Sequence, residues 1–191
     1  MKASPMNHQL QAGVSLIEVL VAILLLSFGI LAVGTMLSYT VQMHKLSGYR
    51  AAAINLASSY IERIRANPGG FSNGSYDKVS SYESSLTKLS IDSTKICAYP
   101  ICDMNTLATM DFEQEKVAVR RELPAGGMLM LRDTTSGISS STTGNMWIVW
   151  QEPSTYAVLD PSSSDNCPKV VTDTYPDPNP KPHCVYMRFK L

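Results

Sequence analysis

The stretch Gly13-Val14-Ser15-Leu16-Ile17-Glu18-Val19-Leu20-Val21-Ala22-Ile23-Leu24-Leu25-Leu26 opens an apolar run that continues to Leu37. A helix over residues 14–37 would be about 36 Å long at a rise of ~1.5 Å per residue, and the hydrocarbon core of a bilayer is ~30 Å thick. A surface helix of a soluble domain has a polar face, whereas this stretch has none before Ser38. We therefore expect residues 14–37 to span a membrane.

Glu18 is the only charged residue of this stretch. A charge at the centre of a membrane helix costs ~2.5–3.5 kcal/mol, and each Leu, Ile, Val or Phe offsets ~0.3–0.6 kcal/mol. The fifteen residues of those four types together offset roughly 7 kcal/mol, so we expect the segment to insert despite its glutamate. A charge kept inside a membrane segment is a candidate functional residue. The alternative is that Glu18 lies close to the water interface and has no specific role.

A glycine, four residues, a glutamate and then a long apolar helix form a pattern similar to the class III signal of type IV prepilins and pseudopilins. The resemblance implies that residues 1–13 are a leader, which a prepilin peptidase removes by cutting between Gly13 and Val14. It also implies that the new amine of Val14 is N-methylated, although the first mature residue in that family is usually phenylalanine. Glu18 would be the glutamate at the fifth mature position, which in that family pairs with a terminal amine during fibre assembly.

Helical periodicity continues beyond the apolar stretch. Apolar residues recur every three or four positions in a single stripe, which predicts an amphipathic helix. The stripe consists of Leu46, Tyr49, Ala53, Leu56, Tyr60 and Ile64. The break comes at Asn67-Pro68-Gly69-Gly70, because the residue before a proline avoids the helical region and glycine ends helices. We expect one helix from about Val14 to Ala66, with residues 38–67 as its amphipathic part; the alternative is two helices divided near Gly48.

Residues 68–191 are expected to form a globular domain, which gives the chain an α+β fold. Helical and alternating patterns predict a loop with a short helical turn at 68–96, a helix at 107–123, strands at Met128–Leu131, Met146–Trp150 and Cys184–Lys190, a candidate short strand at Thr155–Leu159 and a loop at Pro161–Pro182. The helix should bury Ala108, Phe112, Val119 and Leu123. Trp147 and Val149 should lie on one face of their strand, with Ile148 and Trp150 on the other. The order resembles the type IV pilin fold, in which a long N-terminal helix packs on a small antiparallel sheet.

All four cysteines, Cys97, Cys102, Cys167 and Cys184, follow the apolar stretch. An even number of cysteines in this position points to two disulfides in an oxidising compartment. Three pairings are open, and we favour Cys97–Cys102 and Cys167–Cys184 because each pair brackets a short loop that contains proline. A zinc site that uses these cysteines with His183 is the alternative, but their spacings match no compact zinc motif.

The composition argues against several function classes. The 191 residues contain 16 basic and 16 acidic side chains, so we expect no nucleic-acid partner. No nucleophile elbow, phosphate-binding loop or metal-spaced His/Glu pair occurs in the sequence. We therefore expect no enzyme, no cofactor and no resident metal. Asp173, Asp177 and Asn179 are candidate calcium ligands, although the alternating prolines around them are more typical of a rigid, solvated turn.

Beyond its N-terminal signal, the chain resembles minor pilins of the PilV type in Tyr60–Arg65 and in the order of helix, Leu123–Gly127 turn and strands. This resemblance implies a single inner-membrane span with a periplasmic C-terminal domain, followed by incorporation into the type IV pilus. The implied partners are the prepilin peptidase, the inner-membrane assembly platform, the major pilin and other minor pilins, with which the chain would start assembly at the pilus tip and support twitching motility. A minor pseudopilin of a type II secretion system and a bitopic envelope protein whose head binds a ligand are the alternatives.

Overall fold

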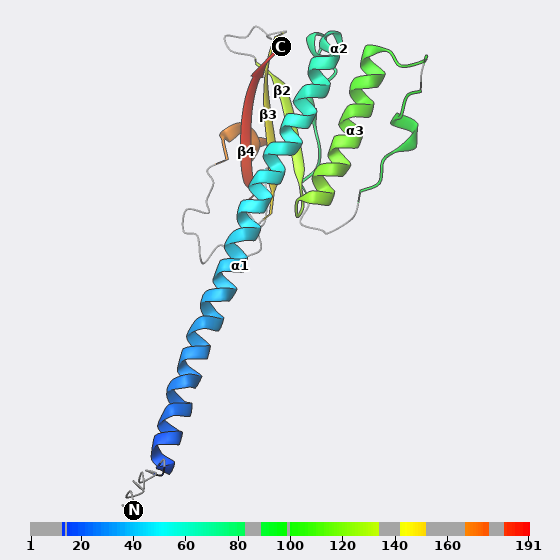
Figure 1. Ribbon diagram of the computed structural model, residues 1–191. Coiled ribbons are helices and arrows are strands. Elements are labelled where there is room, and N and C mark those ends of the chain that lie inside the picture. The colour runs from blue at the N-terminus through cyan, green and yellow to red at the C-terminus, as the bar shows by residue number, and fades with distance from the viewer. Residues whose placement is uncertain are drawn as a thin grey trace, which may run out of the picture. The chain divides into compact units, whose positions relative to one another are not determined.

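The computed structural model describes residues 13, 15–82, 89–98, 100–133, 142–151, 167–175 and 182–191. The chain divides into two compact units, Met1–Met43 and His44–Leu191, and we call the second unit the head. The described elements are α1 (Leu16–Ala66), α2 (Pro68–Ser72), β1 (Lys78–Val79), the 3-10 helix η1 (Ser93–Lys95), α3 (Met104–Glu122), β2 (Gly127–Arg132), β3 (Thr143–Trp150), α5 (Lys169–Thr174) and β4 (His183–Lys190) (Figure 1).

Helix α1 is continuous from Leu16 to Ala66, so the expected single long helix is confirmed and the division near Gly48 is wrong. Val14, the expected first residue of the helix, lies outside the described residues. Asn67 follows the end of α1 and caps α2, since its side-chain oxygen accepts a hydrogen bond of 3.2 Å from the backbone N–H of Gly70. Pro68 then occupies the first turn of α2, where its missing N–H costs nothing.

The head contains an antiparallel sheet with the strand order β1-β2-β3-β4. Met128 of β2 pairs with Ile148 of β3, which in turn pairs with Val185 of β4. The three strands expected at Met128–Leu131, Met146–Trp150 and Cys184–Lys190 are therefore present, each slightly longer than predicted. A long helix with a small antiparallel sheet confirms the α+β class.

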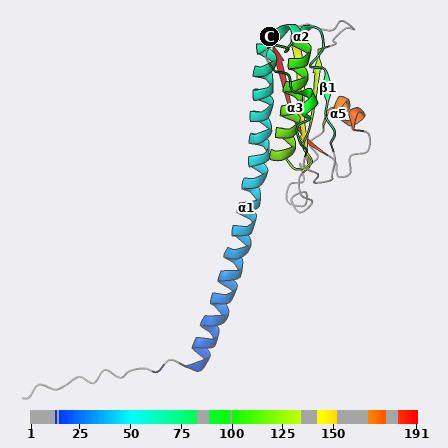
Figure 2. The same ribbon diagram turned by 90° about the vertical axis from the view of Figure 1, so that its right-hand side faces the viewer.

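The two faces of the sheet are covered by different elements. On one face, Met128, Met146, Ile148 and Trp150 belong to a core that includes buried side chains of α1 and α3. The predicted residues Ala108, Phe112 and Val119 of α3 are part of this core, as is Leu123, which follows α3. On the other face, Leu129, Trp147 and Val149 cluster with Val171 of α5 and Tyr175. Figure 2 shows α5 on the side of the sheet opposite to α1 and α3. The predicted alternation of faces in β3 is confirmed, and both faces are buried.

Two segments that the sequence predicts as loops contain regular structure. Residues 68–96 include β1, and the predicted loop at Pro161–Pro182 includes helix α5. Both elements depend on contacts distant in sequence, since Lys78 pairs with Met130 and Val171 is buried against the sheet. Local patterns carry no signal for such contacts. The candidate strand Thr155–Leu159 lies outside the described residues.

Candidate assembly site

The start of α1 is defined by Ser15. Its carbonyl oxygen accepts hydrogen bonds from the backbone N–H groups of Glu18, at 3.0 Å, and Val19, at 3.3 Å, which closes the first turn. Gly13 is exposed just before this turn. Cleavage is expected between Gly13 and Val14, and methylation at Val14. Val14 itself lies outside the described residues. The structure therefore places Glu18 in the first helical turn, close in sequence to the expected new N-terminus.

Glu18 lies at the end of α1 where a carboxylate is favourable. Unpaired backbone N–H groups give the N-terminus of a helix a partial positive charge, which favours acidic residues in the first turn. The Glu18 side chain is exposed, and among the described residues it makes no ion pair or side-chain hydrogen bond. In the sequence it is the only charged residue between Gly13 and His44. The carboxylate is therefore free to meet a cation supplied from outside the chain.

Three hydroxyl side chains of this region are satisfied inside the helix. The hydroxyl groups of Ser27, Thr35 and Thr40 donate to the backbone carbonyl oxygens of Ile23, Ala32 and Met36 at 2.7, 2.8 and 2.9 Å. Such bonds let hydroxyl side chains enter an apolar environment at low cost. Glu18, by contrast, is a charged side chain of this region that still needs an external partner.

The apolar side chains around Glu18 form a continuous exposed surface. From Leu16 to Leu37 the exposed fraction of the large apolar side chains runs from 47% for Val19 to 78% for Leu16. Helix α1 is long and apolar enough to cross a membrane. Apart from the neighbouring backbone of α1 itself, no described atom lies within 4 Å of the position that a Cβ would take on Gly29 or Gly34. This surface is available to lipid or to other helices.

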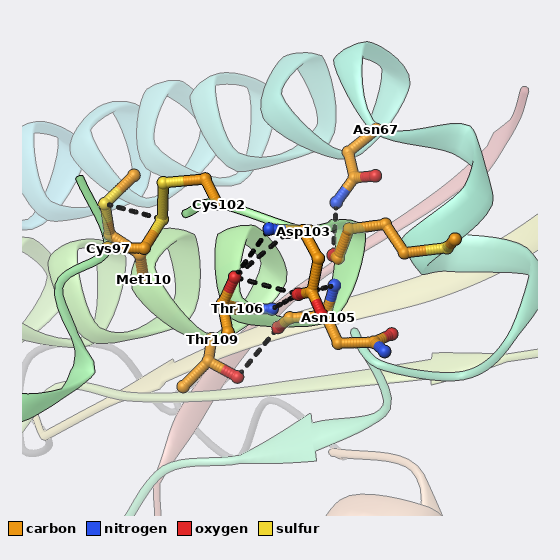
Figure 3. The surroundings of a disulfide bond; sticks show 9 residues. Asn67, Cys97, Cys102, Asp103, Asn105, Thr106, Thr109 and Met110 are labelled. Atoms are coloured by element: carbon orange, nitrogen blue, oxygen red, sulfur yellow. Dashed lines mark hydrogen bonds between the residues drawn. A yellow bond between two sulfur atoms is a disulfide. The ribbon is translucent and has the colours of Figure 1, made fainter. Parts of the chain in front are cut away.

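The head contains two disulfides, Cys97–Cys102 and Cys167–Cys184, separated by 5 and 17 residues in sequence. Figure 3 shows the first bond beside the start of α3, where the Asp103 carboxylate accepts hydrogen bonds from the backbone N–H groups of Asn105 at 3.0 Å and Thr106 at 2.7 Å. The bond from Thr106 is the main cause that lowers the pKa of Asp103 below its ordinary value. The second disulfide, Cys167–Cys184, links the residues before α5 to β4.

The cysteines and His183, which were considered for a zinc site, have other roles in the described parts of the head. Each cysteine is bonded to another cysteine, and His183 is buried with its ring stacked on Trp150 at 6.1 Å between centroids. Asp173 lies in α5, whereas Asp177 and Asn179 are outside the described residues. In the described part of the chain, no group of three or more His, Cys, Asp or Glu side chains could hold a metal ion.

Sequence reasoning missed a polar cluster in the head. Asp111 and Glu115 of α3 are buried, and Arg63 of α1 lies 3.7 Å from Asp111. The available signal was a pair of acidic residues four apart on the predicted helix, which places them on one face. Their position among the buried apolar residues of α3 shows which way that face points.

Two family comparisons agree with this geometry. Residues 9–34 match the family described as the prokaryotic N-terminal methylation motif, and this match includes Gly13, Val14 and Glu18. Residues 38–113 match the family described as type IV pilin Tt1218, from the second part of α1 into α3. No curated protein and no solved structure matches the chain. These two family matches, the long helix with an exposed apolar N-terminal half and the disulfide-bonded α+β head together support a type IV pilin.

Proposed function

We propose that this type IV pilin is a minor subunit that helps to start pilus assembly in a complex with other minor pilins at the tip. Members of the family are structural subunits, and no enzymatic family is indicated for this chain. The observation that carries the proposal is Glu18, the only charge in an apolar surface that the rest of the described chain leaves exposed. The minor role and the tip position rest on the resemblance of Tyr60–Arg65 and Leu123–Gly127 to minor pilins.

The proposed mechanism begins in the inner membrane, with the head in the periplasm. A prepilin peptidase cuts between Gly13 and Val14, and the amine of Val14 is methylated. The apolar part of α1 then leaves the lipid and packs among the corresponding helices of the growing fibre. This transfer keeps the apolar side chains away from water throughout, so it does not oppose the hydrophobic effect.

Glu18 then fixes the axial position of the new subunit. A carboxylate buried in an apolar fibre core without a partner is strongly unfavourable, whereas one that meets a terminal amine forms an ion pair. Only a position that brings Glu18 to the amine of a neighbouring subunit removes the penalty. The head decides which subunits can be neighbours, because its side chains are more varied than the apolar side chains of the N-terminal part of α1.

The N-terminus of the membrane-extracted protein tests the first step. We expect intact-mass and peptide mass spectrometry to find a chain that begins with N-methylated Val14. A chain that retains Met1 would contradict the processing step and favour a plain membrane anchor. A strain that lacks the prepilin peptidase supplies the control, since the leader should remain attached there.

Glu18→Ala tests the assembly step. We expect this variant to insert in the membrane and to lose its leader as wild type does, but to be absent from sheared pili when these are probed by immunoblot. Ser27→Ala is the matched control, because Ser27 lies on the same apolar surface and its hydroxyl bonds within the helix. Recovery of Glu18→Ala in sheared pili at the wild-type level would remove the role given to Glu18.

Deletion of the gene for this chain tests the proposed minor role. It also distinguishes a minor pilin from a subunit of a type II secretion system. We expect the deletion to reduce surface pili and twitching motility, to leave type II secretion intact and to be complemented by wild type. Antibodies against the head should label pilus tips. Labelling along the whole fibre would indicate a major subunit, and loss of protein secretion with normal twitching would indicate a pseudopilin.

A further inference from the structure

Two carboxyl groups of α3 are buried against α1 within the head. Asp111 and Glu115 lie one turn apart, and their residues are 6% and 2% exposed. Side chains four residues apart share one face of a helix, so both carboxyl groups occupy the same apolar interior. Each of them needs a cation, hydrogen-bond donors or a proton to remain there.

The available donors and the cation serve Asp111. The Tyr76 hydroxyl donates to Asp111 Oδ2 at 2.7 Å, and Arg63 Nη1 lies 3.7 Å from Asp111 Oδ1. Arg63 Nη1 also donates to Gln114 Oε1 at 2.6 Å. Glu115 Oε1 and the Tyr60 hydroxyl are buried without a hydrogen-bond partner in the described part of the chain. Glu115 is therefore the member of the cluster whose charge is least compensated.

The charges that face Glu115 do not balance if it is ionised. Helix α1 contributes Arg63 and the neutral Tyr60, and α3 contributes Asp111; Tyr76 closes the cluster after α2 through its bond to Asp111. One cation would then face two anions. Burial raises the pKa of Glu115 from its ordinary value of 4.5 to about 7; Arg63 opposes the rise and Asp111 adds to it.

We propose that Glu115 is a proton-binding site that holds α3 against α1 and makes the head sensitive to pH. In the protonated form the carboxyl is neutral and needs no cation in the apolar interior. Loss of that proton to solvent places a second negative charge beside Asp111. The contact between the two helices then weakens, because the buried anion needs water or a cation that the closed cluster does not supply.

The direction of the pH effect follows from proton linkage. Between about pH 4.5 and pH 7 the folded head binds more protons at Glu115 than the unfolded chain does. The stabilising contribution is fully present below the unfolded pKa and is lost as the pH rises through the folded pKa. The two pKa values differ by about 2.5, which corresponds to an unfolding equilibrium constant that rises by at most about 300-fold from this group.

Unfolding of the full-length chain in detergent micelles at pH 4.5 to 8.5, followed by tryptophan fluorescence, tests the proposal. We expect the wild type to lose stability as the pH rises and Glu115→Gln to lose much less over the same interval. Glu62→Gln is the matched control, because Glu62 is exposed on α1 and should leave the wild-type pH dependence unchanged. A Glu115→Gln profile parallel to that of wild type would overturn the proposal.

A direct titration of Glu115 distinguishes proton binding from a purely structural role. The ¹³C signal of the Glu115 carboxyl carbon, identified by its absence from Glu115→Gln, should titrate in the folded chain with a midpoint near pH 7. Asp111→Asn should move this midpoint to lower pH because it removes a neighbouring negative charge, and Arg63→Gln should move it to higher pH because it removes the cation. A midpoint near the ordinary value of 4.5, or one that neither variant moves, would show that the cluster does not store a proton.

Discussion

The two parts of α1 differ in what covers their apolar side chains. In the head, Ala53, Tyr60 and Ile64 of α1 are fully buried, and their neighbours in the core come from the same chain. Between Leu16 and Leu37, the large apolar side chains are exposed. The same helix thus carries one stripe that folding satisfies and one surface that folding leaves uncovered.

This difference separates stability from assembly. The hydrophobic effect is worth roughly 25 cal/mol for each Å² of apolar surface removed from water. In the head this contribution is realised when the chain folds. In the N-terminal unit it is realised only when lipid or another subunit covers the helix. Substitutions in the two parts of α1 should therefore fail in different experiments.

The largest expected difference in stability is between substitutions of two isoleucines of α1. Ile64 is 0% exposed and Ile30 is 65% exposed. Ile64→Ala should lower the free energy of unfolding of the head by about 2–5 kcal/mol, because it leaves a cavity in the core. Ile30→Ala should change it by less than about 0.5 kcal/mol. Denaturant unfolding in detergent micelles, followed by the fluorescence of the two tryptophans of β3, measures both values.

An equal loss of stability in the two variants would contradict the difference between the two parts of α1. It would mean that the chain itself covers the apolar surface around Ile30. If only Ile64→Ala lowers the free energy of unfolding, the apolar surface of the N-terminal unit is available to lipid or to other subunits. Membrane extraction of both variants checks that each is still inserted.

The periodic parts of this fold were predictable from sequence because their environment repeats along the chain. The stripe at Ala53, Tyr60 and Ile64 has the helical period, and the alternation from Met146 to Trp150 has the strand period. Helix α5 and strand β1 were missed because they are short and depend on partners remote in sequence. Val171 is buried only because the sheet face at Leu129 and Val149 is present beside it.

The candidate assembly site was predictable for a different reason. Glu18 stands out because its charge contradicts the apolar residues on both sides, and the family match at residues 9–34 is carried by the same segment. Glu115 gave a weaker signal, its position four residues after Asp111 on the predicted helix. It lies in a sequence rich in charged residues, and the packing of α3 against α1 shows that its side chain is buried.

The disulfides provide an intermediate effect that should stay within the head. Cys167–Cys184 closes a longer loop than Cys97–Cys102, with sequence separations of 17 and 5. Loop-closure entropy predicts that Cys167→Ser with Cys184→Ser costs about 3 kcal/mol and that Cys97→Ser with Cys102→Ser costs about 2 kcal/mol. Denaturant unfolding should give this order, and membrane insertion should be unchanged in both. The reverse order would show that strain or packing, and not loop length, decides the contribution.

The smallest expected effect comes from a second glutamate on α1. Glu62 Oε1 accepts a hydrogen bond of 2.6 Å from Arg65 Nη1, and the two side chains are 68% and 46% exposed. An exposed pair of this kind contributes at most about 0.5 kcal/mol, so Glu62→Ala should barely change the unfolding curve and should enter sheared pili normally. Glu18→Ala should likewise leave the head folded, because Glu18 lies outside it, yet be lost from pili. If Glu62→Ala were excluded from pili to the same extent, the requirement would concern negative charge anywhere on α1. If only Glu18→Ala is excluded, the requirement belongs to the one carboxylate that has no water around it once the apolar surface is covered.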